Sequence, residues 1–330
     1  MTSPFPKSSS LAGEGRIVVK LSPNDISTLE SMTYQYPLKL ISPAILSEQS
    51  SVLVFLLSYG GGLVGGDQIN LSIEVRPKAR LSIVTQGHTK IFRSARPDII
   101  TRQNLKVEIK DEGALCLLPD PVQPFESSIY EQIQIFKLTS NASLYLLDWV
   151  TQGRTARGEN WSLGRWVGRN EVWSVSDDTA SKDRLLVRDT VILDGANRPT
   201  GSPSLRESMY GNAIAGTLIL RGPMTKSLGE FFLAEFASLP RLGARDFRTA
   251  EARKKDEEIP QSPLERWRNI RLEEERVKQI SWSAANVRGC VVVKFGAATV
   301  EAARNWIGSM ILQEGSVERH FGEQALMCIR

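Results

Sequence analysis

The sequence predicts a mainly β protein with a few helices in its C-terminal third. Short runs of alternating or continuous apolar residues recur before residue 225. Each is bounded by Gly, Pro, Asn or Asp, as is typical of strands. Windows with helical periodicity are few in the same region, which indicates an all-β body. The expected strands are Val52–Leu57, Gln68–Val75, Ala79–Thr85, Thr101–Ile109, Ala114–Leu118, Ile129–Leu138, Ser143–Val150, Arg184–Ile192 and Ala213–Leu220.

The character of the chain changes near residue 226. A strand is expected at Val291–Phe295, and helical periodicity is found on both sides of it. Ser262 can cap a helix whose first position is Pro263. The apolar face of that helix is expected to hold Trp267, Ile270 and Val277. The three expected helices are Leu228–Ala237, Leu264–Gln279 and Ala297–Leu312.

The domain organisation follows from composition. Residues 1–14 are small and polar and are expected to form a mobile tail. Residues 15–330 are expected to form a single domain, with a charged helical insertion at about 241–285. Because this segment mixes both signs of charge, we interpret it as a solvated surface insertion rather than a partner-binding helix.

Charge and cysteine content exclude several classes of protein. There are 41 basic and 37 acidic residues, a net charge of +4, which is too small for a nucleic-acid footprint. Three widely spaced cysteines, Cys116, Cys290 and Cys328, favour a reducing compartment over a disulfide framework. No run of eighteen apolar residues and no secretory signal is present, so a cytoplasmic protein without a membrane partner is expected.

The segment Gly60-Gly61-Gly62-Leu63-Val64-Gly65-Gly66-Asp67 holds five glycines in seven positions. It contains G-x-G-x-x-G, which indicates a dinucleotide site only where a helix begins at the third glycine. Here Gln68–Val75 alternates apolar and polar residues instead, and this pattern predicts a strand. The sequence therefore argues against a nucleotide site.

Two motifs carry a resemblance to a known family. The glycine segment is followed by Thr85-Gln86-Gly87-His88-Thr89-Lys90-Ile91-Phe92-Arg93, and a second block reads D-W-V-T-Q-G-R-T-A-R-G-E from Asp148 to Glu159. Together they resemble the UreD (UreH) urease accessory proteins. Gly216–Leu220 and Cys290–Ile311 are also similar to that family. The resemblance implies a β-helix-like wrap of strands, with helices near the C-terminus.

Four carboxylates are candidates for a functional site. Asp67 is either a turn residue or an accessible carboxylate beside close-packed backbone. Asp148 follows a buried run and is expected to pair with Arg154 or Arg157. Both arginines are also expected to hold a long loop through a salt-bridge network with Glu159. The full set of candidates is Asp67, Asp148, Glu159 and Glu171, with Gly60, Gly61, Gly62, Gly65, Gly66, Arg154 and Arg157 as structural motif residues.

No pattern of a permanent metal or catalytic site is found. Only two histidines, His88 and His320, are present, without C-x-x-C or H-x-H spacing. Neither G-x-S-x-G nor G-x-x-x-x-G-K-[ST] occurs. Carboxylates hold nickel more weakly than thiolate or imidazole ligands, so the four candidates suit transient passage. A β-rich enzyme acting on carbohydrate, with Trp161, Trp166 and Trp173 stacking on sugars, or a nucleotide-dependent enzyme, remains the alternative.

The resemblance implies a non-catalytic scaffold and metallochaperone. UreD-type proteins act with urease apoprotein, a UreF-type protein and a UreG-type GTPase to insert nickel into urease, where a lysine must also be carbamylated. Nickel in transit would be the cargo, no cofactor would be bound permanently, and the partner would handle GTP. The resemblance leaves open a homodimer within the complex.

Overall fold

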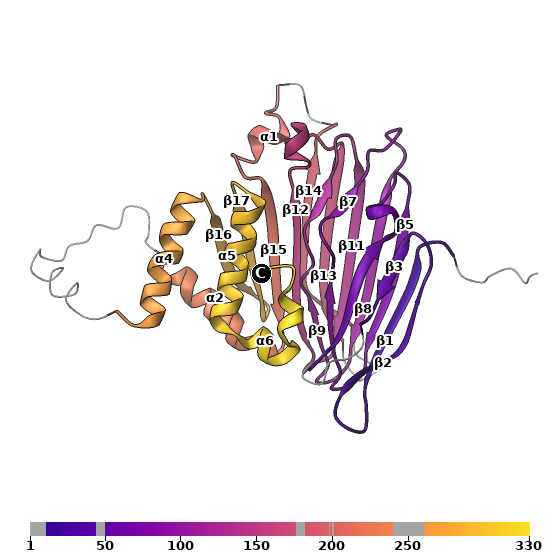
Figure 1. Cartoon of the computed structure of the whole chain (residues 1–330), viewed down its shortest axis with the longest axis vertical. Helices are drawn as coiled ribbons and strands as arrows, with labels where there is room; N and C mark the ends of the chain where they lie inside the picture. Colours follow the sequence, from indigo (N-terminus) through magenta and orange to yellow (C-terminus); the bar gives the residue numbers. More distant parts are fainter. Residues whose placement is uncertain (1–10, 44–49, 176–181, 198, 200, 240–260) are drawn as a thin grey trace, which may run out of the picture.

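The computed structural model describes residues 11–43, 50–175, 182–197, 199, 201–239 and 261–330. Two large sheets lie against each other in these ranges, and helices cover the outer face of the larger sheet (Figure 1). Most of the predicted tail, residues 1–10, lies outside the described ranges. Glu14 already begins the first strand.

The smaller sheet has seven strands, of which the five central ones run parallel. The two edge strands are antiparallel to their neighbours. From one edge to the other, the order is β14 (Arg184–Asp194), β13 (Arg165–Ser174), β11 (Ile129–Leu138), β8 (Thr101–Ile109), β5 (Gln68–Val75), β1 (Glu14–Leu21) and β2 (Ser27–Tyr34).

The larger sheet has ten strands and a parallel centre formed by β4, β6, β9 and β12. Two short strands, β7 (Thr89–Ile91) and β10 (Val122–Pro124), attach to it beside β12. The main order is β16 (Ser281–Val287), β17 (Cys290–Ala297), β15 (Ile214–Arg221), β12 (Ser143–Thr151), β9 (Ala114–Leu117), β6 (Arg80–Val84), β4 (Val52–Ser58) and β3 (Leu38–Ile41).

The chain alternates between the two sheets from β4 to β13, so each circuit adds one parallel strand to each sheet. This winding confirms the predicted mainly β, β-helix-like fold. At one end the connections are tight turns stacked on one another. Lys78 donates its backbone N–H to Asp111 over 3.0 Å, and Ser143 donates to Gly113 over 2.9 Å. Between β4 and β13, the longer connections, which carry both sequence motifs, therefore lie at the opposite end.

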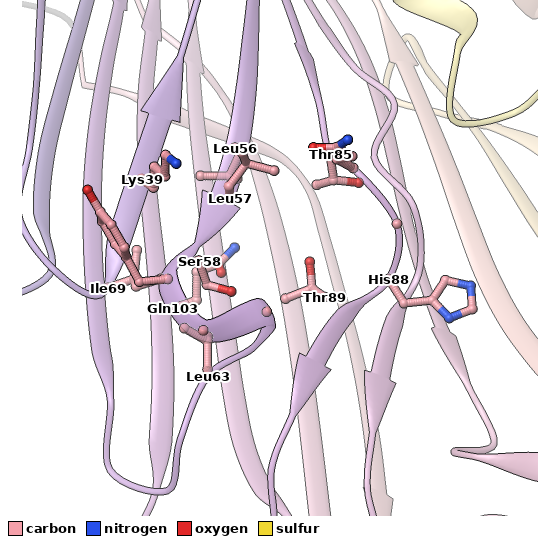
Figure 2. Close-up of a pocket in the computed structure, with 15 residues that line it drawn as sticks. Lys39, Leu56, Leu57, Ser58, Leu63, Ile69, Thr85, His88, Thr89 and Gln103 are labelled. Carbon is pink, nitrogen blue, oxygen red and sulfur yellow. The ribbon is translucent and has the colours of Figure 1, made fainter.

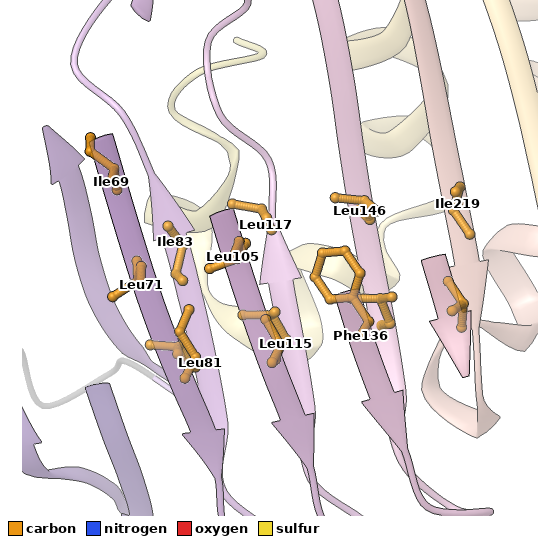
Figure 3. Packing of buried hydrophobic residues seen from close by; sticks show 14 of the residues in the cluster. Ile69, Leu71, Leu81, Ile83, Leu105, Leu115, Leu117, Phe136, Leu146 and Ile219 are labelled. Carbon is orange, nitrogen blue, oxygen red and sulfur yellow. The ribbon is translucent and has the colours of Figure 1, made fainter. Parts of the chain in front are cut away.

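Two hydrophobic cores hold the layers together. Leu144 and Leu146 of β12 point between the sheets, whereas Tyr145 and Trp149 point toward the helices. This explains why β12 is buried along its whole length. Figure 3 shows the core between the sheets, where leucine and isoleucine side chains from neighbouring strands interdigitate. Such two-sided burial produces the apolar runs from which the strands were predicted.

The four longer helices of the described ranges pack on the outer face of the larger sheet, near β15, β16 and β17, whereas the short helix Leu205–Ser208 lies at one end and places Leu205 in the core between the sheets (Figure 1). The predicted cap is confirmed, because Ser262 Oγ accepts from the Glu265 backbone N–H and Pro263 is the first helical residue. The helices are α1 (Leu205–Ser208), α2 (Lys226–Ala237), α4 (Pro263–Val277), α5 (Val300–Glu314) and α6 (Ser316–Phe321).

The predicted apolar face of α4 is wrong for two of its three residues. Ile270 and Val277 are each 63% exposed, whereas Arg271 and Glu275 are buried. Charges can be buried here because they are bonded to one another and to the polar tips of aromatic side chains. Arg271 donates to Glu235 of α2, and Glu275 accepts from Trp306 of α5 over 2.8 Å. The described part of the charged segment is therefore packed onto the domain, although residues 240–260 lie outside the described ranges.

Candidate functional site

The glycine-rich segment forms a turn between β4 and β5 that requires glycine for two reasons. Gly60 and Gly61 have φ values of 72° and 74°, in the left-handed region that side chains disfavour. Gly62 is extended, but a Cβ there would lie 2.7 Å from the carbonyl oxygen of Lys90. The third glycine of G-x-G-x-x-G leads into strand β5 and not into a helix, so the predicted strand is confirmed.

Asp67 closes this turn. One of its carboxylate oxygens, Oδ2, accepts the backbone N–H of Val64 over 2.8 Å, and the Asp67 backbone N–H donates to Val64 over 3.0 Å. The side chain is half-buried and faces the turn itself. The geometry thus supports the turn interpretation of Asp67.

The second motif forms a compact loop after β12. Glu159 is buried and accepts from the Arg154 backbone N–H over 2.7 Å and from Arg154 Nε over 2.9 Å. Arg154 also lies 3.8 Å above the ring of Phe125. Burial acts to raise the pKa of Glu159, but the hydrogen bonds from Arg154 outweigh it and the pKa is lowered. The predicted salt-bridge network is present for this pair, while Arg157 is exposed.

Asp148 lies inside the molecule, and the expectation that it pairs with Arg154 or Arg157 is wrong. Its carboxylate faces the space between the sheets, where Gln132 Nε2 donates to Oδ1 over 2.9 Å and Asn170 Nδ2 donates to Oδ2 over 2.7 Å. Both partners are uncharged. Burial raises the pKa of Asp148, and the two amide hydrogen bonds oppose this rise. Arg154 is not available because Glu159 holds it.

Glu171 occupies the other face of β13. Its partners are Arg188 Nε and Trp173 Nε1, each at 2.9 Å, and Arg188 stands opposite it on the edge strand β14. The structure therefore does not bring the four candidate carboxylates together. Of the four, Asp148 alone faces the space between the sheets.

A row of polar side chains crosses the space between the sheets at the level of Asp148. Gln134 donates to Asn170, and further along Thr217 and Lys294 bond to Asp189 over 3.1 Å and 2.6 Å. A cavity of about 30 Å³ lies beside Asp148. It shares Leu56, Thr85, Thr89 and Gln103 with a larger opening of about 290 Å³ near the glycine turn (Figure 2).

Comparisons with known proteins show the family of the chain. The model of the family described as "UreD urease accessory protein" matches residues 12–327. The chain belongs to the UreD family. It is 32% identical to an "Uncharacterized urease accessory protein ureD-like" of Schizosaccharomyces pombe, over 89% of this chain and 91% of that one. It is also 32% identical to "Urease accessory protein 4" of Cryptococcus neoformans (66% and 73%) and to "Urease accessory protein D" of Arabidopsis thaliana (65% and 69%). Membership of the UreD family supports a role in urease maturation.

Possible metal ligands are scattered in the part of the UreD chain that the structure describes. In the described ranges, no three His, Cys, Asp or Glu side chains are grouped closely enough to hold a metal ion. Asp148 is a single carboxylate, and the amide groups of Gln132 and Asn170 that contact it act as hydrogen-bond donors. None of the described helices is long and apolar enough to cross a membrane.

Two features of the UreD chain bear on the alternative enzymes. Trp161 and Trp166 are almost fully buried, so neither offers a stacking surface for a sugar. The three cysteines are free and buried, and burial raises the pKa of Cys290 to about 11. A thiol with so high a pKa is a poor nucleophile.

Sequence reasoning missed Gln132, Gln134, Asn170 and Asp189. The signal was present in β11, where Gln132 and Gln134 share the phase of Tyr130 and Phe136. The isoleucines of this strand occupy the other phase and are half-exposed. If the isoleucines were assumed to face the core because they are apolar, the wrong face of β11 would thus be placed inward.

Proposed function

We propose that this protein is a non-catalytic scaffold in urease maturation that also lets nickel pass along its interior. It would bind urease apoprotein together with UreF-type and UreG-type proteins, in the cytoplasm, with GTP handled by the UreG-type partner. No cofactor would be bound permanently. Family membership supports the scaffold role, and the buried polar row around Asp148 supports the passage of an ion.

The observation that carries the nickel proposal is a buried carboxylate without a cationic partner in direct contact. Buried carboxylates are costly unless paired, and among the described residues the donors to Asp148 are both amides. A divalent cation beside it would stabilise the ionised form, because an opposite charge within a few ångströms favours the charged state. Asp148 is therefore the group that would meet nickel in transit, with the amide side chains of Gln132 and Asn170 in contact with it.

The scaffold proposal is tested by reconstitution. The tagged chain is co-purified with urease apoprotein and the UreF-type and UreG-type proteins, and the mass of the complex is measured by light scattering. Urease activity is then measured after addition of nickel, bicarbonate and GTP, with and without this chain. A complex whose activation of urease needs this chain is expected. Equal activation without it would refute the scaffold role.

The nickel proposal is tested by two matched variants in the same assay. Asp148→Asn is expected to reduce activation about tenfold or more while the complex still forms. Glu171→Gln is the control, since Glu171 is equally buried and nearby but lies on the outer face of the sheet. Equal activation by Asp148→Asn and wild type would exclude Asp148 from the path.

A further inference from the structure

The opening near the glycine turn passes through the larger sheet. Strands β4 and β6 pair only as far as Phe55 and Val84, and beyond that point they separate. Lys39 and Tyr59 lie at the outer side of the gap, because Leu38 and Leu40, on either side of Lys39, point inward. Gln103 of the opposite sheet lies at its inner side. Figure 2 shows these side chains arriving from different strands.

Four polar side chains of the opening form a set without hydrogen-bond partners among the described residues. Lys39, Ser58, Thr89 and Gln103 are all half-buried. None of the four makes a side-chain hydrogen bond or ion pair with a residue that the structure describes. Lys39 Nζ instead lies 5.5 Å from the centre of the Tyr59 ring. Convergent, unpartnered polar groups in a pocket are characteristic of a ligand site.

The charge of the opening selects the class of ligand. Within the described ranges, no aspartate or glutamate lines it, whereas Lys39 supplies a positive charge. The ammonium group donates hydrogen bonds and accepts none, so its best partner is an anionic acceptor. Burial lowers the pKa of His88, which also lines the opening, so that side chain adds little charge.

The apolar residues that line the opening indicate the kind of group to which the anion of the ligand is attached. Leu56 and Leu57, which are half-buried, give the opening an apolar surface next to its polar one. Its volume of about 290 Å³ is at the lower end of the range for small-molecule sites, roughly 300–1,000 Å³. A bare inorganic anion would leave the apolar surface uncovered, and a short aliphatic stem would cover it.

We infer that this opening binds a carboxylate on a short aliphatic stem, with the carboxylate paired to Lys39. The ligand is either a free short-chain carboxylic acid or an acidic side chain of another protein, since both present the same chemistry. The inference does not depend on nickel passing Asp148, and its test measures ligand binding and not urease activation.

The test uses saturation-transfer NMR titrations of the full chain with two pairs of probes. The free probes are glutarate and its neutral analogue glutaramide. The peptide probes are Gly-Gly-Glu-Gly-Gly with blocked termini and the same peptide with Gln in place of Glu. The carboxylate member of at least one pair is expected to bind, and its neutral partner to bind at least about tenfold more weakly, as expected for loss of a charge-assisted hydrogen bond.

Three variants assign the binding to Lys39. Lys39→Gln is expected to weaken carboxylate binding about tenfold or more, and Lys39→Arg, which keeps the charge, to weaken it far less. Lys90→Gln is the control, because Lys90 is exposed beside the opening but does not line it, and a change within about twofold is expected.

The outcomes separate the two sources. Tighter binding of glutarate than of the Glu peptide indicates a free carboxylic acid, and tighter binding of the Glu peptide indicates an acidic side chain. Failure of both carboxylates to bind, or binding that Lys39→Gln leaves unchanged, would overturn the inference. Neither result alters the urease reconstitution assay, so failure here is distinct from failure of the scaffold role.

Discussion

Asn170 and Glu171 are consecutive residues of β13 that face opposite sides of the sheet. Asn170 donates to Asp148 in the interior over 2.7 Å, whereas Glu171 accepts from Arg188 on the outer face over 2.9 Å. Side chains alternate between the two faces of a strand, so one position decides which residue meets the interior. An amide thus lies where the sequence had suggested a carboxylate, and this amide contacts the carboxylate of Asp148.

The first prediction concerns the pH dependence of stability at Asp148. Burial raises the pKa of this carboxyl above its ordinary value of 3.8. Between pH 3.8 and the raised pKa, the folded protein therefore keeps a proton on Asp148 that the unfolded chain has released. Stability contributed by this group is complete below pH 3.8 and is lost as the pH rises through the raised pKa. Relative to wild type, Asp148→Asn should become progressively more stable over this pH interval.

Thermal unfolding of both proteins across pH 4–8 measures this effect. The difference in Tm between them isolates the contribution of one group, because the other titrating residues are shared. A difference in Tm that stays constant with pH would contradict a raised pKa at Asp148.

The second prediction concerns close packing at the glycine turn. Gly62→Ala places a Cβ 2.6 Å from the Phe92 ring and 2.7 Å from the Lys90 carbonyl oxygen, closer than atoms can pack. The free energy of unfolding should fall by about 1–3 kcal/mol, the usual cost of overpacking. Chemical denaturation measures the change. Gly65→Ala is the control, since its closest contacts are 3.3 Å and its cost should be smaller.

Much of the fold could be predicted from the sequence because buried parallel strands give apolar runs. Gln68–Val75, Thr101–Ile109 and Ile129–Leu138 were predicted with the boundaries that the structure has. Strand β13 was missed, since its buried positions include Gly168, Asn170 and Glu171. A strand with polar residues on both faces has no apolar period from which it could be recognised.

The candidate site was harder to predict, because it depends on distances between residues far apart in the chain. Arg154 was an equally plausible partner for Asp148 or Glu159 by spacing alone. The loop after β12 turns back so that Arg154 donates to Glu159 through both its backbone and its side chain. Only the path of this loop decides between the two, and it leaves Asp148 with the amides of neighbouring strands.

The third prediction concerns the buried pair in the second motif. Glu159→Gln removes a charged acceptor from Arg154, and the free energy of unfolding at pH 7 should fall by about 2 kcal/mol. The pKa of Glu159 is lowered from 4.5, so its stabilising contribution exists above that pH and is lost as the pH falls through the lowered value. Denaturation at pH 7 and below pH 4 should therefore show a smaller cost in acid. A cost independent of pH would show that the charge of Glu159 contributes nothing.

The fourth prediction concerns the buried charges that attach α4. Glu235 of α2 is 2% exposed and accepts from Arg268 Nε over 2.9 Å and Arg271 Nη2 over 3.0 Å. Glu235→Ala leaves Arg271 buried with one carboxylate partner fewer. Breaking a buried ion pair in this way typically costs about 3–5 kcal/mol. Chemical denaturation should show a loss of this size.

Glu230→Ala is the matched control for Glu235→Ala. Glu230 lies on the same helix, but it is exposed and pairs with Lys226 at 3.9 Å, a surface contact expected to contribute about 0–1 kcal/mol. Loss of α4 packing should also expose amides of residues 263–277 to faster hydrogen exchange in Glu235→Ala alone. Equal effects of the two variants would mean that α4 is held by its aromatic contacts, such as Trp267 with Phe231, and not by the buried charges.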